Sequence, residues 1–209
     1  MHTRIFARWI SVDHRPGLTA LIILFLTSAL FGAWSIMGSW ATHASVLLVP
    51  GAIGVPFGIP PVRLSPLGGT TAGFFLVDLI AAAAMLVVAA MRLENSVRRH
   101  PNGGAARAFW AAWGASVCGV IVGNLIRAIY TTFVVDANLI GYLGILVGAV
   151  LFAAIWGGAV GILPGIVAAL VRLASRPRAT DPAPLVGPEP LIGPEPLIGP
   201  EPHRGVATP

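Results

Sequence analysis

The amino-acid sequence predicts an all-α membrane protein, a bundle of four transmembrane helices. Hydrophobic residues make up 56% of the chain and charged residues only 10%. A soluble domain carries about a quarter charged residues, so this chain lacks the polar surface that it would need to face water. The apolar residues also fall into long runs, each able to span a hydrocarbon core of about 30 Å. The predicted spans are residues 18–40, 73–91, 108–135 and 139–171.

Residues 1–17 are expected to form an N-terminal interfacial segment. The apolar residues of this segment fall near one helical face and its arginines on the other, which is typical of a helix lying in the headgroup plane. A plain positively charged flank explains so short a segment equally well. Residues 18–40 exceed the about 7–15 residues of a signal-peptide core, so a retained membrane anchor is favoured over a cleaved signal.

Residues 43–71 form a long, proline-rich outer loop between the first two spans. This loop is too rich in proline to be a spanning helix and too apolar to be an ordinary hydrated loop. Three interpretations remain open: a loop pressed on the outer end of the bundle, a surface that docks a partner, and a re-entrant segment. Re-entrant backbone must be shielded by protein, so the third is the least favoured.

Two charged residues are predicted to lie inside the transmembrane region, Asp78 in the second span and Arg127 in the third. Both lie near the same end of antiparallel spans, so we expect them at similar depth. An unpaired charge there costs at least about 2.5 kcal/mol, which favours an ion pair between them. Asn124 lies one turn deeper than Arg127 and Tyr130 one turn shallower on nearly the same face. These four residues are the candidate intramembrane polar cluster.

The polar cluster has two interpretations. One is a structural lock that holds two helices in register. The other is an anion- or substrate-binding site, because intramembrane charges are functional candidates by default. The lock is favoured, since Arg127 lies close enough to the interface for its side chain to reach the headgroups.

Small residues recur at every fourth position in the third and fourth spans. Such rows let the backbone of a neighbouring helix approach closely, as in helix association within lipid. We therefore expect spans three and four to be antiparallel neighbours that meet along the two rows, with a tight turn at residues 135–138 between them. The rows are Ala111, Ala115, Gly119 and Gly123 in span three, and Ala149, Ala153, Gly157, Gly161 and Gly165 in span four.

The distribution of arginines predicts the orientation. The arginines that flank the spans gather on one side, and Arg63 is the only one expected on the other. Positive charge is enriched on the cytoplasmic side, so both termini are predicted to be cytoplasmic in a cell (plasma) membrane. In layout the chain resembles small four-span bacterial membrane proteins, and its arginine-rich, lysine-free composition is typical of a high-GC coding sequence.

Residues 176–209 are expected to be a disordered, proline-rich tail. A six-residue repeat returns Glu189, Glu195 and Glu201, and the three residues per turn of polyproline II place all three on one edge. The composition favours a semi-rigid tail without a partner. The alternative is that residues 185–202 are a docking ligand for a cytoplasmic partner.

The sequence contains no recognisable catalytic set. Its histidines are not spaced as metal ligands, and it has no paired carboxylates, nucleophile elbow or phosphate-binding loop. We therefore expect no enzymatic activity, metal or cofactor. The leading hypothesis is a non-enzymatic accessory or scaffold subunit of a membrane complex, in contact with lipid and with a membrane-protein partner or second copy, but not with nucleic acid. The alternative is a small transporter or permease subunit whose path is lined by Asp78, Asn124 and Arg127.

Overall fold

The structure is a computed structural model of the 209-residue chain. It describes residues 14–33, 56, 58–63, 71–101 and 103–175. Within these ranges the chain forms four helices and no strands, and all four are long and apolar enough to cross a membrane. The prediction of an all-helical protein with four helices long and apolar enough to cross a membrane is confirmed for the described residues. The helices are α2 (Arg15–Gly32), α5 (Ala72–Arg99), α6 (Ala105–Val134) and α7 (Leu139–Ala174).

Several predicted regions lie outside the described residues. These are most of the interfacial segment (1–17), the end of the first predicted span (34–40), most of the outer loop (43–71) and the proline-rich tail (176–209).

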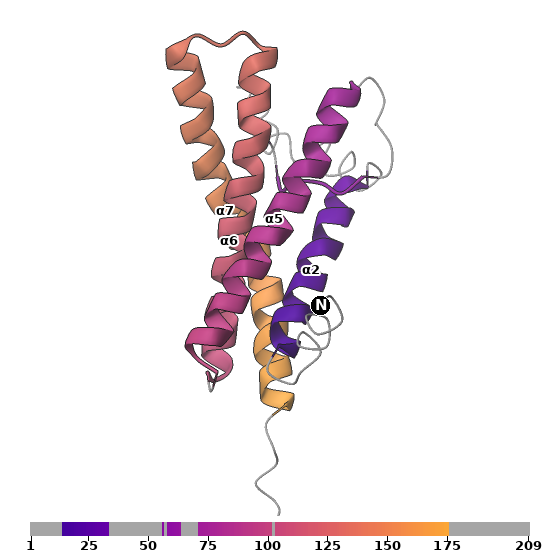
Figure 1. Ribbon diagram of the computed structural model, residues 1–209, viewed down its shortest axis with the longest axis vertical. Helices are drawn as coiled ribbons and strands as arrows, with labels where there is room; N and C mark the ends of the chain where they lie inside the picture. Colours follow the sequence, from indigo (N-terminus) through magenta and orange to yellow (C-terminus); the bar gives the residue numbers. More distant parts are fainter. Residues whose placement is uncertain (1–13, 34–55, 57, 64–70, 102, 176–209) are drawn as a thin grey trace, which may run out of the picture. The chain divides into compact units, whose positions relative to one another are not determined.

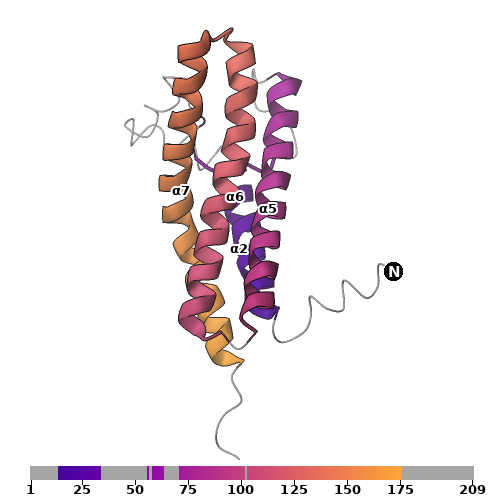
Figure 2. The same cartoon turned by 60° about the vertical axis from the view of Figure 1, so that its left-hand side comes forward.

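The helix α6 lies at the middle of the bundle's main layer. It packs along α7 on one side and α5 on the other, while α2 packs mainly against α7. Figure 2 shows α7, α6 and α5 side by side, with α2 behind them. Figure 1 shows that α6 and α7 extend well past the end of α2. Near that end of α2, part of the connection between α2 and α5 lies among the helices.

The turn between α6 and α7 makes these helices antiparallel neighbours. Asp136 has a positive φ of 46°, a conformation that aspartate tolerates better than most residues. Asn138 then caps α7, because its side-chain oxygen accepts a hydrogen bond from the backbone N–H of Gly141 at 2.8 Å. The short polar turn thus reverses the chain between two apolar helices.

The first helix begins earlier than the predicted span, whose predicted end at residue 40 lies outside the described residues. It begins at Arg15, three residues before the predicted start at residue 18, and its first turn contains Pro16. Proline is tolerated in the first turn of a helix because its missing N–H would have no helical partner there. The helix ends at Gly32, where a Cβ atom would lie 2.1 Å from the carbonyl oxygen of Val62. A side chain at position 32 would therefore collide with the returning chain.

The second helix is longer than predicted, because it continues to Arg99 instead of ending at Met91. Its last two turns are polar on one face but bury Leu93 on the other. Hydropathy detects only the part of a helix that faces lipid, so it misses such an extension. Pro101 follows His100 directly and stops the helix, because a residue that precedes proline, here His100, disfavours the helical conformation.

The small-residue row of α7 contacts α6. A Cβ atom added at Gly157 would lie 3.0 Å from Cα of Val117, and one added at Gly161 would lie 3.2 Å from the carbonyl oxygen of Trp113. Gly165 lies against the ring of Phe109. In the same row, Ala149 and Ala153 are fully buried.

The small-residue row of α6 does not face the row of α7. A Cβ atom at Gly119 would lie 2.6 Å from the carbonyl oxygen of Met85, and one at Gly123 would lie 2.8 Å from that of Ala81. Both of these contacts are with α5, so the prediction that the two rows meet is wrong for the glycines of the α6 row. A four-residue period indicates a face of close contact, but it does not identify which of two neighbouring helices occupies that face.

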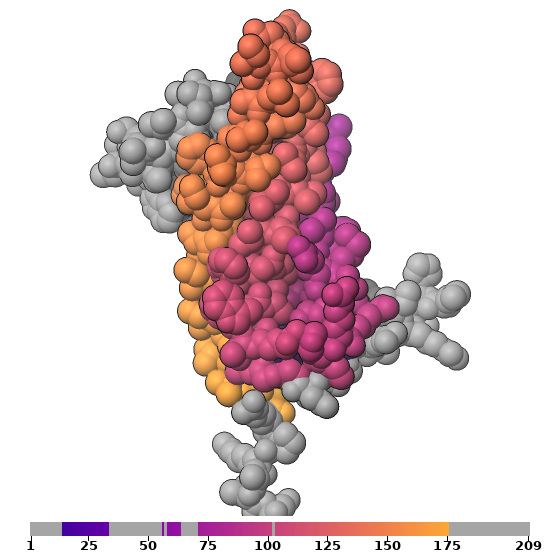
Figure 3. Space-filling view, turned by 90° about the vertical axis from the view of Figure 1, so that its left-hand side faces the viewer, coloured from indigo at the N-terminus to yellow at the C-terminus, as the bar shows by residue number. Residues whose placement is uncertain are grey.

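Large apolar side chains cover the outside of the bundle. Ile140 is 82% exposed and Phe133 74% exposed, and exposed leucines, isoleucines and valines occur on all four helices. Part of this surface, over α6 and α7, is visible in Figure 3. A soluble protein rarely exposes so much contiguous apolar surface, whereas lipid acyl chains would cover it.

Candidate functional site

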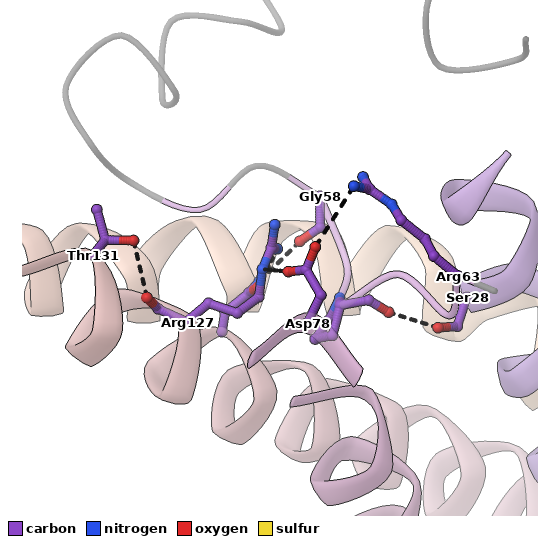
Figure 4. A network of polar contacts seen from close by, with 8 residues as sticks. Ser28, Gly58, Arg63, Asp78, Arg127 and Thr131 are labelled. Atoms are coloured by element: carbon purple, nitrogen blue, oxygen red, sulfur yellow. Dashed lines mark hydrogen bonds and ion pairs between the residues drawn. The ribbon is translucent and has the colours of Figure 1, made fainter. Parts of the chain in front are cut away.

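The candidate site is a buried polar centre at the junction of α5, α6 and the segment 58–63. Figure 4 shows Asp78, Arg127 and Arg63 pointing toward one another from these three elements. The Nε atom of Arg127 donates a hydrogen bond to Oδ1 of Asp78 at 2.8 Å. The other carboxylate oxygen, Oδ2, lies 3.7 Å from Nη1 of Arg63. One carboxylate that is only 8% exposed thus lies between two guanidinium groups, which leaves one positive charge in excess.

Asn124 connects the ion pair to the segment 58–63. Its side chain is fully buried. Its Oδ1 atom accepts a hydrogen bond from Nη1 of Arg127 at 3.0 Å, and its Nδ2 atom donates to the carbonyl oxygen of Gly58 at 2.8 Å. The amide therefore satisfies a guanidinium N–H on one side and a backbone carbonyl on the other.

The segment 58–63 crosses the bundle in an extended form. Its residues Ile59 and Pro60 are essentially inaccessible. Backbone groups in such surroundings need partners, and α2 supplies two of them: the hydroxyl of Ser28 donates to the carbonyl oxygen of Pro60, and the carbonyl oxygen of Ser28 accepts from the N–H of Val62 at 3.2 Å. Pro60 and Pro61 have no N–H, so two donors that would need partners are absent.

Two glycines allow this segment to pack closely, Gly58 within the segment and Gly123 on α6. Gly58 has a φ of +71°, a conformation that favours glycine, and it lies against the ring of Phe31. A Cβ atom at Gly123 would lie 2.5 Å from Cγ of Pro60. Since Gly123 is about 16 Å along α6 from Val134 at about 1.5 Å per residue, Pro60 lies deep among the helices.

This position bears on the three interpretations of residues 43–71, of which the structure describes only residues 56, 58–63 and 71. The sequence favoured a loop pressed on the outer end of the bundle over a re-entrant segment. Residues 58–63 instead lie between α2, α5 and α6, with their carbonyl groups bonded to Ser28 and Asn124. The flanking helices shield this backbone, and the two adjacent prolines remove two N–H donors that would otherwise need partners. For the loop as a whole, the order of the three interpretations stays a prediction.

Tyr130 is separate from the polar centre. Its ring packs edge-on against Phe74, with ring centroids 4.9 Å apart, and its hydroxyl lies close to Gly73. Among the described contacts, none joins Tyr130 to Asp78 or Arg127. The structure therefore brings together three of the four residues of the predicted cluster.

Sequence reasoning did not assign Arg63, Gly58 or Ser28 to the site. Arg63 stood out only as the single arginine expected on its side of the membrane. Ser28 is a lone polar residue within an apolar span, and such a residue often bonds its own helix. The density of prolines around position 60 was the available signal, because buried extended backbone is easier to satisfy when donors are missing.

The polar centre is suited to holding charges in place. It contains a single carboxylate and neither a histidine nor a cysteine. Within the described ranges, no group of three or more histidine, cysteine, aspartate or glutamate side chains could hold a metal ion. The chain matches no protein-family model, no curated protein and no solved structure.

Proposed function

We propose that the protein is a non-enzymatic accessory or scaffold subunit of a membrane complex. The observation that carries this proposal is the direct 2.8 Å contact between Arg127 and Asp78. Together with the bond from Asn124 to Gly58, this contact commits the buried polar groups to holding α5, α6 and the segment 58–63 to one another. Groups that bind and release a substrate need to exchange partners, whereas groups in a lock remain paired.

The orientation belongs to the same proposal. Both termini lie in the cytoplasm, in the plasma membrane of a bacterium. Support comes from the charges at the two ends of the bundle: Arg98, Arg99, Arg107 and Arg172 lie near the connection between α5 and α6, and Arg63 lies toward the opposite end. Positive charge is enriched on the cytoplasmic side of membrane proteins.

The partner is a second membrane protein or another copy of the chain. An attachment point for a cytoplasmic partner is available in the repeat at residues 185–202. The test is quantitative affinity purification of the full chain in mild detergent after crosslinking in the intact membrane. We expect one partner, or a second copy, at a constant ratio in several detergents. A chain that is recovered as a solitary monomer throughout would contradict the proposal.

A small transporter or permease subunit for an anion is a second candidate. It is favoured by the excess positive charge at the polar centre and by Nε of Arg63, which is buried without a hydrogen-bond partner. In that case Asp78, Asn124 and Arg127 line the path, and the anion competes with Asp78 for Arg63.

Exchange of the two charges separates the candidates. The double variant Asp78→Arg with Arg127→Asp would place a new arginine beside Arg63, so both the variant and its reference need the Arg63→Gln background. A lock predicts that the exchanged pair recovers part of the thermal stability lost in each single variant. A transport path instead predicts that the unmodified protein, which retains Arg63, takes up labelled phosphate or chloride into proteoliposomes, and that Arg63→Gln loses this uptake. Recovery of stability in the exchanged pair, without any uptake by the unmodified protein, supports the scaffold.

A further inference from the structure

A second polar region lies at the opposite end of the bundle from Asp78. There the ends of all four helices surround a hollow of about 50 Å³, which has space for a few water-sized groups. The inner wall is apolar and includes Leu93, Ala108, Ala111 and Ala168. The rim carries His100, Arg107 and Arg172.

The shape of the hollow is maintained by Arg172. This residue lies in the last turn of α7, and its guanidinium reaches the connection between α5 and α6. There Nε donates to the carbonyl oxygen of Gly103 at 3.0 Å, and Nη2 donates to that of Pro101 at 2.7 Å. The guanidinium of Arg172 thus holds the connection between α5 and α6 in place at the rim.

The rim also carries a cation, Arg107, that is not neutralised. Arg107 and His100 are exposed, and their side chains form no ion pair within the described part of the chain. No acidic residue is among those that line the hollow. Glu94, the nearest acid along α5, is already 3.2 Å from Nε2 of His14 and 2.9 Å from Nε of Arg98. The hollow thus combines a cationic rim with an apolar wall.

The surroundings of the hollow match the boundary between hydrocarbon and headgroups. Trp110 lies one turn from Arg107 on α6 and is 62% exposed, and exposed tryptophans concentrate at that depth in membrane proteins. Basic pockets between transmembrane helices bind the phosphate groups of anionic lipids. The apolar wall beside the rim suits the glycerol and the first acyl carbons of such a lipid. A free ion would leave this wall uncovered.

We propose that the hollow rimmed by His100, Arg107 and Arg172 binds the phosphate headgroup of an anionic phospholipid. Arg107 contacts the phosphate, while Arg172 holds the rim in its shape. The wall formed by Ala108 and Ala111 receives the apolar part of the lipid next to the phosphate. This site is independent of the function proposed above, since it involves none of the residues of the polar centre.

The test measures lipid retained by the full chain. The protein is reconstituted in nanodiscs of equimolar phosphatidylcholine and phosphatidylglycerol, released into detergent, and analysed by native mass spectrometry. We expect retained phosphatidylglycerol to exceed phosphatidylcholine. The Arg107→Gln variant should bind it about fivefold more weakly, because a basic residue near an anionic surface contributes about 1 kcal/mol.

Two further variants make the result specific. Arg98→Gln removes an equal charge from an arginine that is paired with Glu94 and absent from the lining of the hollow, so its lipid retention should stay unchanged. Ala111→Phe fills the apolar wall without altering any charge, and it should also reduce retention. Thermal unfolding of each variant verifies that the bundle is intact.

Three outcomes would overturn the proposal. Equal retention of the two lipids would exclude selection for an anionic headgroup. An effect of Arg98→Gln as large as that of Arg107→Gln would indicate attraction to the whole basic end. Displacement of the lipid by inorganic phosphate, with Ala111→Phe having no effect, would identify a site for a free phosphate ion instead.

Discussion

Asp78 and Arg107 mark two ends of the same bundle, and their surroundings differ in almost every respect. Asp78 is 8% exposed, and both of its carboxylate oxygens face arginines. Arg107 is exposed beside an open hollow, with no acid on its lining. The difference teaches that burial and pairing separate two kinds of charge: we expect the enclosed Asp78 to affect mainly stability and the exposed Arg107 to affect mainly binding. Each prediction below tests this contrast.

The largest effect is expected at Asp78. The substitution Asp78→Asn removes the carboxylate from between the partly buried guanidinium groups of Arg63 and Arg127. We expect it to lower the free energy of unfolding by about 3 kcal/mol, the lower end of the cost of breaking a buried pair, because both arginines are partly exposed. Arg127→Gln should lower the free energy of unfolding by less, because Asp78 still has Arg63 as a partner at 3.7 Å. Chemical unfolding in mixed micelles measures both values. Equal losses for the two variants would mean that Arg63 contributes nothing to the centre.

A smaller effect is expected where α6 meets α5. In Gly123→Ala the new methyl group would lie 2.8 Å from the carbonyl oxygen of Ala81 and 2.5 Å from Pro60. A backbone oxygen cannot avoid the clash by a change of rotamer, so the helices must separate, at about 1–3 kcal/mol.

Gly114 on the same helix is the matched control, because nothing lies within 4 Å of a Cβ atom added there. Gly114→Ala should raise stability slightly, since alanine is favoured over glycine in a helix by up to about 1 kcal/mol. The same unfolding assay applies. Destabilisation of both variants to the same extent would show that the space around Gly123 is not what matters.

The smallest effect is expected at the exposed end. Arg98 pairs with Glu94 at 2.9 Å, but its side chain is 62% exposed. Exposed pairs contribute about 0.2–1 kcal/mol, so Arg98→Gln should lower stability by less than Asp78→Asn, Arg127→Gln or Gly123→Ala. The shift should shrink further in high salt, because screening weakens exposed pairs. A loss of stability as large as that of Asp78→Asn would contradict the expected difference between the two ends of the bundle.

The helices were predictable from the sequence because an apolar run long enough to span lipid has few other uses. The contact between Asp78 and Arg127 was foreseeable on similar grounds, since matching depth leaves each charge one evident partner. Arg63 was not foreseeable, because its position depends on how an irregular segment folds back between helices. The partner of the α6 glycine row was equally hidden, since a row of small residues fits either neighbour of a central helix.

Pro60 has a consequence for the order in which the molecule assembles. The ribosome delivers α2 first and α5 second, with residues 58–63 between them. The surface that accepts Pro60 includes Gly123, and the amide that binds Gly58 belongs to Asn124. Both of these residues arrive only with α6. Residues 58–63 can therefore reach their final contacts only after the third helix has been made.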